Sequence, residues 1–81
     1  MPGASPTAAE LGRVIRELRE ERGQTIEELA GEAGIHTTYL SAIELGRRNP
    51  SWNKVGAIAA ALGMEISALA GAVEKRVTRR G

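Results

Sequence analysis

A run of small or polar side chains, followed by two neighbouring arginines, lies in the middle of this 81-residue chain. A hydroxyl group can donate or accept a hydrogen bond at the edge of a base pair, and the methyl group of threonine can contact that of thymine. A guanidinium group suits phosphate oxygens, and a neighbouring amide can add a hydrogen bond. The small or polar residues concerned are His36, Thr37, Thr38, Ser41 and Ala42 on the outer side of one helical pattern, followed by Arg47, Arg48 and Asn49. We therefore expect the helix to contact base edges and the following segment to contact phosphates.

Both groups also have simpler interpretations. The helical residues could form a solvated surface, and Arg47 and Arg48 could belong to an ordinary polar loop. No Gln, Asn or Arg stands among the first outward residues, so no bidentate contact to a base is evident. If this segment binds DNA, we expect modest direct readout that is assisted by the shape of the DNA.

Two short helical patterns that meet at Gly34 would position these side chains. Apolar or small residues recur at helical spacing on both sides of that glycine: Leu29, Ala30, Ala33, Ile35, Leu40 and Ile43. Gly34 can adopt the left-handed backbone of a tight turn, where a side chain would cost about 1 kcal/mol. Ala30 is small at the point where the second helix must cross closely. This spacing is typical of a helix-turn-helix, whose second helix can enter the major groove of DNA.

Capping patterns indicate where other helices begin. Thr7 stands three residues before Glu10, and Thr25 stands three residues before Glu28, so each pair predicts a capping box at a helix start. Ser51 follows a proline-containing loop and is expected to cap a further helix. His36 occupies the cap position of the helix after Gly34, where it would be a weaker cap than Ser or Thr.

The whole chain is predicted to be all-α. We expect five helices: from Thr7 to Gly23, from Thr25 to Gly34, from about His36 to Leu45, from Ser51 to Gly63, and from about Ile66 onward. No segment has the pattern of a strand. In domain terms, residues 1–7 are expected to be a flexible lead-in, residues 8–73 a DNA-binding bundle, and residues 74–81 a basic extension.

Composition narrows the class of protein. The chain is near the lower size at which an unaided core suffices, so a partner chain that buries more apolar surface is expected. The absence of cysteine excludes disulfides and cysteine-bound zinc, and it fits the cytoplasm. No apolar run approaches the roughly 20 residues that span a bilayer. The amino terminus lacks the architecture of a signal peptide, so a cytoplasmic, nucleoid-associated protein is expected.

Charge and catalytic residue types exclude further classes. The net charge is only +1, which disfavours a protein that coats nucleic acid indiscriminately. His36 is the only histidine and the chain contains no aspartate, so neither a metal site nor a catalytic triad is indicated. We expect no cofactor, no small-molecule ligand and no enzymatic activity.

With these segments in view, the chain resembles the lambda-repressor-like, Cro-type helix-turn-helix regulators, also called the xenobiotic-response-element family. The resemblance covers roughly Leu11 to Leu69. It is carried by four segments: IRELREERG, TIEELAGEAGI, YLSAIELGRRNPS and IAAALGM. It implies binding of operator DNA by a dimer.

The resemblance also implies roles for individual residues. Thr37, Thr38, Ser41 and Ala42 match base-reading positions, Tyr39 matches a position against the sugar-phosphate backbone, and the loop of Gly46, Arg47, Arg48 and Asn49 matches a phosphate-contacting loop. Thr25 and His36 complete the implied DNA-binding set, and the His36 ring could donate to a phosphate. Family members often carry Gln where this chain has Ile26, so that phosphate contact is not implied here.

Arginines on the first helix are expected to differ in role. Arg13, Arg16 and Arg22 are interleaved with glutamates, which is typical of a solvated surface. Arg19 matches the family position that pairs with the glutamate at the end of the recognition helix, here Glu44. The resemblance thus implies a structural ion pair between the first and third helices.

Apolar residues near the carboxyl terminus exceed what a four-helix core needs. Leu69, Val73 and Val77 recur at helical spacing. They could pack onto the core of the same chain. We favour a two-fold seam between two copies.

The sequence therefore favours a homodimer that binds an inverted-repeat operator and regulates transcription. A restriction-modification controller, a phage-type repressor or the DNA-binding part of a longer protein would each fit. The alternative is a protein-interaction module, such as an adaptor or an antitoxin, built on the same bundle. Salt-dependent DNA binding that Arg47→Ala weakens would separate the first from the second.

Overall fold

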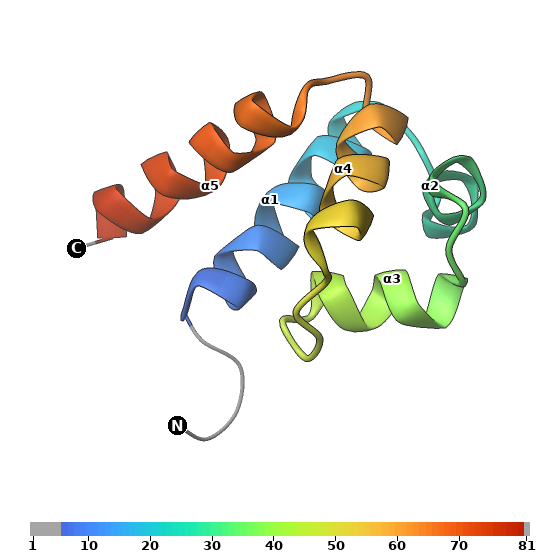
Figure 1. The fold of residues 1–81 in the computed structure, drawn as a ribbon, viewed down its shortest axis with the longest axis horizontal. Coiled ribbons are helices and arrows are strands. Elements are labelled where there is room, and N and C mark those ends of the chain that lie inside the picture. The colour runs from blue at the N-terminus through green and yellow to red at the C-terminus, as the bar shows by residue number, and fades with distance from the viewer. Residues whose placement is uncertain (1–5, 81) are drawn as a thin grey trace.

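The computed structural model describes residues 6–80, with side chains described over 7–78, and these residues form five helices (Figure 1). The helices are α1 (Pro6–Glu21), α2 (Ile26–Ala33), α3 (Thr37–Glu44), α4 (Trp52–Ala61) and α5 (Ile66–Arg80). The predicted all-α, five-helix architecture is confirmed. The part of the expected lead-in that precedes Pro6 lies outside the described residues.

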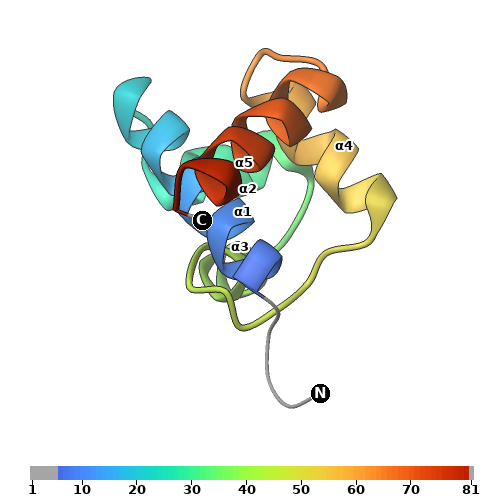
Figure 2. The ribbon, with the colours of Figure 1, turned by 90° about the vertical axis from the view of Figure 1, so that its left-hand side faces the viewer.

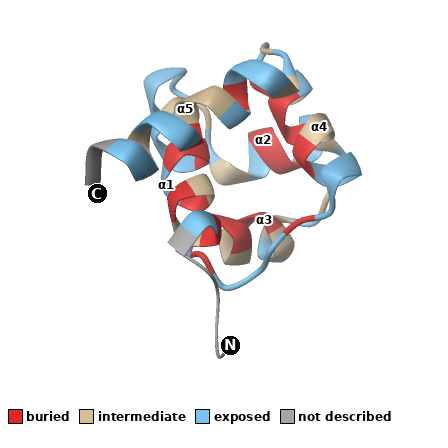
Figure 3. Ribbon diagram, turned by 60° about the vertical axis from the view of Figure 1, so that its left-hand side comes forward, coloured by how far each residue is buried: buried red, intermediate tan, exposed pale blue. Residues whose placement is uncertain are grey.

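Helix α1 lies between α3 on one side and α5 on the other and packs against both (Figures 1 and 2). Helix α4 packs against α2 and α5, and α2 packs against α3. All five helices contribute buried residues, and each helix also carries exposed ones (Figure 3). The core consists of Val14, Ile15, Leu29, Ala30, Leu40, Ile43, Val55, Ile58, Ala59, Leu62, Leu69 and Val73.

Two of the predicted caps are present. The Thr25 hydroxyl accepts a hydrogen bond of 3.1 Å from the Glu28 amide, and a Glu28 carboxylate oxygen accepts one of 2.8 Å from the Thr25 amide. This reciprocal capping box satisfies donors that the first turn of a helix leaves unpaired. The Ser51 hydroxyl accepts a hydrogen bond from the Lys54 amide at the start of α4. His36 stands at the N-cap of α3 and makes no side-chain capping bond.

The capping box predicted at Thr7 and Glu10 is wrong. Helix α1 already begins at Pro6, so Thr7 is a helical residue. A proline fits the first helical position because it has no amide hydrogen that would need a partner there. The Glu10 side chain is fully buried, and its carboxylate lies 3.7 Å from the Arg76 guanidinium. The Glu10 carboxylate therefore faces Arg76 of α5.

A close approach between α1 and α3 depends on Gly12. A Cβ atom at this position would lie 2.2 Å from the Ile43 carbonyl oxygen and 2.6 Å from that of Glu44. Both atoms belong to the backbone of α3 and cannot move aside as a flexible side chain can. The absence of a side chain at Gly12 therefore sets the distance between the two helices.

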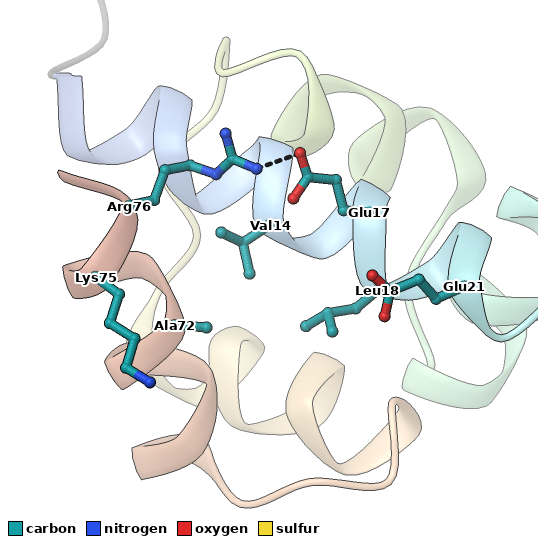
Figure 4. A pocket seen from close by; sticks show the side chains of 7 residues that line it. All are labelled: Val14, Glu17, Leu18, Glu21, Ala72, Lys75 and Arg76. Atoms are coloured by element: carbon teal, nitrogen blue, oxygen red, sulfur yellow. Dashed lines mark hydrogen bonds and ion pairs between the residues drawn. The ribbon is translucent and has the colours of Figure 1, made fainter. Parts of the chain in front are cut away.

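Helix α5 continues to Arg80, so the boundary expected at residue 73 falls inside a continuous helix. Arg76 reaches across to α1, where it forms an ion pair with Glu17 beside the apolar side chains of Val14 and Ala72 (Figure 4). The side chains of Arg79 and Arg80 lie outside the described part of the chain. The described part of the predicted extension is thus the last turns of a helix that is attached to the bundle.

No single helix among the described residues has both the length and the apolar composition needed to cross a membrane. Helix α4 and residues Ile66–Thr78 of α5 meet those two criteria only when they are taken together, and they are bent by 99° at the break between them.

Candidate nucleic-acid interface

The outer side of α3 forms one shallow depression, here called the α3 surface. Its lining residues are Ile26, Thr37, Thr38, Ser41, Ala42, Leu45 and Arg47. The four residues expected to read bases are therefore neighbours on a single surface. On the opposite side of the helix, Leu40 and Ile43 are fully buried in the core. The helix thus has one face fixed by packing and one face free to contact a ligand.

The turn between α2 and α3 fixes the direction of α3. Gly34 has φ 74° and ψ 32°, which is the left-handed conformation that the sequence predicted at this position. The Ile35 amide donates a hydrogen bond of 3.0 Å to the Ala30 carbonyl, and the Gly34 amide donates to that of Gly31. These bonds close the end of α2 and direct the chain into α3 after a short turn.

The far end of α3 is held by an ion pair with α1. Arg19 donates two hydrogen bonds to the Glu44 carboxylate, of 2.8 Å from Nε and 3.0 Å from Nη2. A third, of 2.9 Å, goes from Nη1 to the Gln24 carbonyl. Only 12% of the Arg19 side chain and 5% of the Glu44 side chain are exposed. This bidentate geometry fixes both the distance and the orientation between α1 and the last turn of α3.

The ion pair also alters the titration of the arginine. The hydrogen bond to Glu44 raises the pKa of the Arg19 guanidinium above its usual value, although partial burial of the side chain acts in the opposite direction. The ion pair thus favours the charged form that arginine already holds in proteins.

The loop after α3 places its two arginines differently. Arg47, Arg48 and Asn49 are all exposed, but only Arg47 lines the α3 surface. The Arg48 guanidinium carbon lies 5.1 Å from the centre of the Tyr39 ring, which is within the range of a cation–π contact. The Arg47 side chain therefore flanks the expected base-reading residues, while Arg48 of the loop pairs separately with Tyr39 of α3.

A family description for helix-turn-helix domains matches residues 10–70. The chain belongs to the helix-turn-helix domain family. Among curated relatives, the transcriptional regulator DdrOP3 of Deinococcus deserti is 42% identical over 60 residues, which cover 74% of this chain and 46% of that protein. The chain thus spans about half the length of this curated relative.

Solved helix-turn-helix structures share the fold. The restriction-modification controller protein C.AhdI of Aeromonas hydrophila superposes with a TM-score of 0.74 and is 34% identical, over 76% of this chain and 94% of that one. The controller C.Esp1396I, solved as a tetramer with its natural 35 base-pair operator, gives a TM-score of 0.85 at 27% identity, over 91% of this chain and 97% of that one. The expected resemblance to Cro-type helix-turn-helix regulators is confirmed, and this is a class of DNA-binding proteins rather than of enzymes.

Two further expected DNA contacts stand at the N-caps of the two helices of the helix-turn-helix. Thr25 is exposed, and its hydroxyl oxygen accepts the capping bond at the start of α2 while its hydrogen is available as a donor. His36 is exposed at the start of α3. Neither side chain lines the α3 surface, and contact of either one with phosphate stays a prediction.

Sequence reasoning missed two residues of the α3 surface. Leu45 is 57% exposed and lines the surface together with Ile26. The signal was available for Leu45, because it follows Ser41 and Ala42 at helical spacing and so falls on the same side of α3. Ile26 was noted in the sequence only because family members often carry Gln at this position. Both bring apolar surface to a site that was expected to be polar.

The expectation for Arg22 was also incomplete. It was expected to be solvated, and it is exposed, yet its Nη1 donates a hydrogen bond of 3.0 Å to the Leu62 carbonyl. Leu62 is the C-cap residue of α4. A carbonyl at a helix end has no partner within its own helix, so Arg22 supplies one and joins α1 to α4. Arg13 and Arg16 are exposed, and Arg16 pairs with Glu20 one turn along α1.

The three residues expected at a dimer seam differ in exposure. Leu69 is fully buried, Val73 is 7% exposed and Val77 is 37% exposed. Leu69 and Val73 therefore belong to the core of their own chain, because α5 packs against α1 and α4 and both side chains are buried there. Of the three, Val77 alone has an exposed side chain, and a seam between two copies stays a prediction that now depends on Val77 and its exposed neighbours.

Those neighbours line a second depression, here called the α4–α5 groove. It is lined by Thr7, Leu11, Trp52, Val55, Leu69, Ala70, Val73, Glu74 and Val77. Trp52, at the first position of α4, is 66% exposed and was not singled out from the sequence. An exposed tryptophan beside an exposed valine and alanine is the kind of apolar surface that marks a contact with another molecule.

Proposed function

We propose that this chain binds double-stranded DNA as a sequence-specific regulator of transcription, with α3 in the major groove. The observation that carries the proposal is the α3 surface, where Thr37, Thr38, Ser41 and Ala42 form one accessible patch beside Arg47. A helix with this outward chemistry can present hydroxyl and methyl groups to base edges. Its position is set from behind by Gly12 and by the Arg19–Glu44 pair.

Phosphate contacts would hold the helix in register with the DNA. Arg47 lies at the edge of the α3 surface, and Arg48 lies over Tyr39 on the same helix. Thr25, His36 and Asn49 add exposed hydrogen-bonding groups around it. Such contacts give affinity without sequence information, whereas the α3 surface supplies the choice of sequence. A protein with this function acts at the nucleoid in the cytoplasm.

The proposal includes a homodimer. The α4–α5 groove carries Trp52, Ala70 and Val77, whose burial against a second copy would remove apolar surface from water. A two-fold dimer would place one α3 at each of two half-sites about one helical turn apart, roughly 34 Å, so the preferred site would be an inverted repeat. The structure of C.Esp1396I with its operator supports the assembly of such a fold on DNA, in that case as a tetramer.

Selection from random duplexes tests this proposal. The expected result is a preferred site with two-fold symmetry, bound more tightly than a scrambled duplex of the same composition and length. Both duplexes should be measured at two salt concentrations, because affinity quoted at one salt concentration does not separate phosphate from base contacts. Equal affinity for both duplexes would refute specific recognition. Absence of binding to either, with a protein partner found instead, would support the protein-interaction alternative.

A further inference from the structure

The α3 surface is more apolar than recognition of base edges through hydrogen bonds requires. Most of its exposed area belongs to carbon atoms. Leu45, Ile26 and Ala42 contribute purely apolar side chains, and Thr37 and Thr38 add a methyl group each. None of the lining residues is Asn, Gln, Asp, Glu or Lys, and its guanidinium, from Arg47, comes from the loop after the helix.

Leu45 is the least explained member of this surface. Its side chain is 57% exposed, and the other large exposed apolar residues of the described chain, Trp52 and Val77, line the separate α4–α5 groove. The Leu45 backbone is well fixed, because its amide donates to the Ser41 carbonyl and its neighbour Glu44 is held by Arg19. A leucine held rigidly at the surface on the outer side of α3 would contact whatever α3 contacts.

Only one apolar group is presented by the base pairs in the major groove of unmodified DNA. It is the C5-methyl group of thymine, whereas guanine, adenine and cytosine present donors and acceptors that bidentate side chains read best. A cytosine methylated at C5 carries the same group at the equivalent ring position. An apolar surface of this kind therefore matches methylated pyrimidines better than any other feature of the groove.

We propose that the α3 surface recognises the C5-methyl groups of pyrimidines, with Leu45 as a specificity-determining residue. The inference rests on the proposed function. From Thr37 to Leu45 the helix rises about 12 Å, so it faces roughly three to four base pairs of each half-site. At least one thymine within that span contacts Leu45. Methylation of a cytosine that replaces this thymine restores part of the lost contact.

The test uses the full chain and the duplex selected as its preferred site. Each thymine is replaced by deoxyuridine, which removes the methyl group and leaves every hydrogen-bonding group in place. At the contacted position, affinity should fall about fourfold for one methyl group and about 15-fold when both half-sites are changed, as expected for burial of one methylene-sized group each. Cytosine and 5-methylcytosine at that position should differ in the same direction.

Two variants assign the effect to the leucine. Leu45→Ala should bring the ratio of affinities for the thymine and deoxyuridine duplexes close to one, while Leu45→Met, which keeps an apolar side chain of similar size, should preserve most of it. Arg47→Ala should weaken binding to both duplexes equally, since it removes a phosphate contact. Because Leu45 is exposed, its replacement should leave the thermal unfolding of the protein nearly unchanged.

The possible outcomes separate this inference from the proposed function. A protein that selects a site but binds its thymine and deoxyuridine forms equally is a sequence-specific regulator without methyl recognition, and the inference fails alone. A thymine dependence that survives Leu45→Ala also overturns it. Absence of any preference for a selected site removes the proposed function and this inference together.

Discussion

The α3 surface and the α4–α5 groove are both exposed, but they differ in what lies behind them. The α3 surface stands on a helix whose inner residues, Leu40 and Ile43, are fully buried and whose end is held by Arg19. The α4–α5 groove is lined by core residues themselves, including Leu69 and Val73. The chemistry of α3 can therefore change without disturbing the core, whereas the groove and the core share side chains. Substitutions on the α3 surface are thus expected to affect stability less than substitutions in the α4–α5 groove.

The support behind α3 is where the largest effect is expected. Gly12→Ala would place a methyl group 2.2 Å from the Ile43 carbonyl oxygen, so α1 and α3 would have to separate. Overpacking of this kind should reduce the free energy of unfolding by about 1–3 kcal/mol. Gly31→Ala is the matched control, because a Cβ atom there meets nothing within 4 Å. It should stabilise α2 by up to about 1 kcal/mol, as alanine does in a helix. Chemical denaturation measures both, and equal effects of the two changes would contradict the close approach.

The Arg19–Glu44 pair is the second part of that support. Glu44→Gln removes a charge whose partner is only 12% exposed, so the loss should exceed the roughly 0.2–1 kcal/mol of an exposed pair. Glu20→Gln breaks the exposed Arg16–Glu20 pair within α1 and should cost at most about 0.5 kcal/mol. Thermal or urea unfolding of both variants checks the difference. Similar losses would mean that the pair behaves as surface charge despite its burial.

These supports also show what could be predicted from the sequence. The Thr25–Glu28 box and the turn at Gly34 were predictable because each depends on residues within one turn of the chain. The role of Gly12 was not, because only the backbone of α3, far along the chain, excludes a side chain there. Glu10 was assigned to a cap because its spacing from Thr7 fits one, yet its carboxylate faces Arg76 of α5. Local patterns fix helix ends, while contacts between distant helices can override them.

The same limit explains the site. Periodicity placed Thr37, Thr38, Ser41 and Ala42 on one side of a helix, and these residues do share one surface. It also placed Leu69, Val73 and Val77 on one side of α5, but periodicity cannot tell which part of that side is covered by α4 and which is left exposed. The exposure of Trp52 likewise depends on how α4 packs, and no spacing in the sequence reports it.

The proposed contact between two copies through the α4–α5 groove can be disrupted without affecting the α3 surface. Val77→Glu would place a carboxylate at the proposed contact between two copies, where an unpaired charge is poorly tolerated, so the dimer should dissociate. Because Val77 is 37% exposed in one chain, the variant should stay folded. Val73→Glu would not be a clean test, since Val73 is 7% exposed and its replacement would also disturb the core.

Light scattering at micromolar concentration would measure this change, with circular dichroism as the check on folding. Ala60→Glu is the matched control, because Ala60 is an exposed residue of α4 that does not line the groove. It should leave the dimer intact. A wild-type protein that is already a monomer under these conditions, or an equal response to both substitutions, would count against a dimer formed through this groove.

Substitutions on the α3 surface should alter DNA binding and leave the stability of the protein almost unchanged. Arg47→Ala should lower the slope of log affinity against log salt concentration by about 1, because one fewer phosphate contact releases one fewer counterion. The loss of affinity should be the same for all sequences. Lys75→Ala removes the same charge from α5, which lies on the other side of α1 from α3 (Figure 1), and should leave the slope unchanged.

Thr38→Ala should keep the slope and relax the preference at one base step by about 1–3 kcal/mol if its contact is direct. If Arg47→Ala instead changed the preferred sequence, or Thr38→Ala changed the salt slope, the division of the surface into a phosphate-binding edge and a base-reading centre would be wrong.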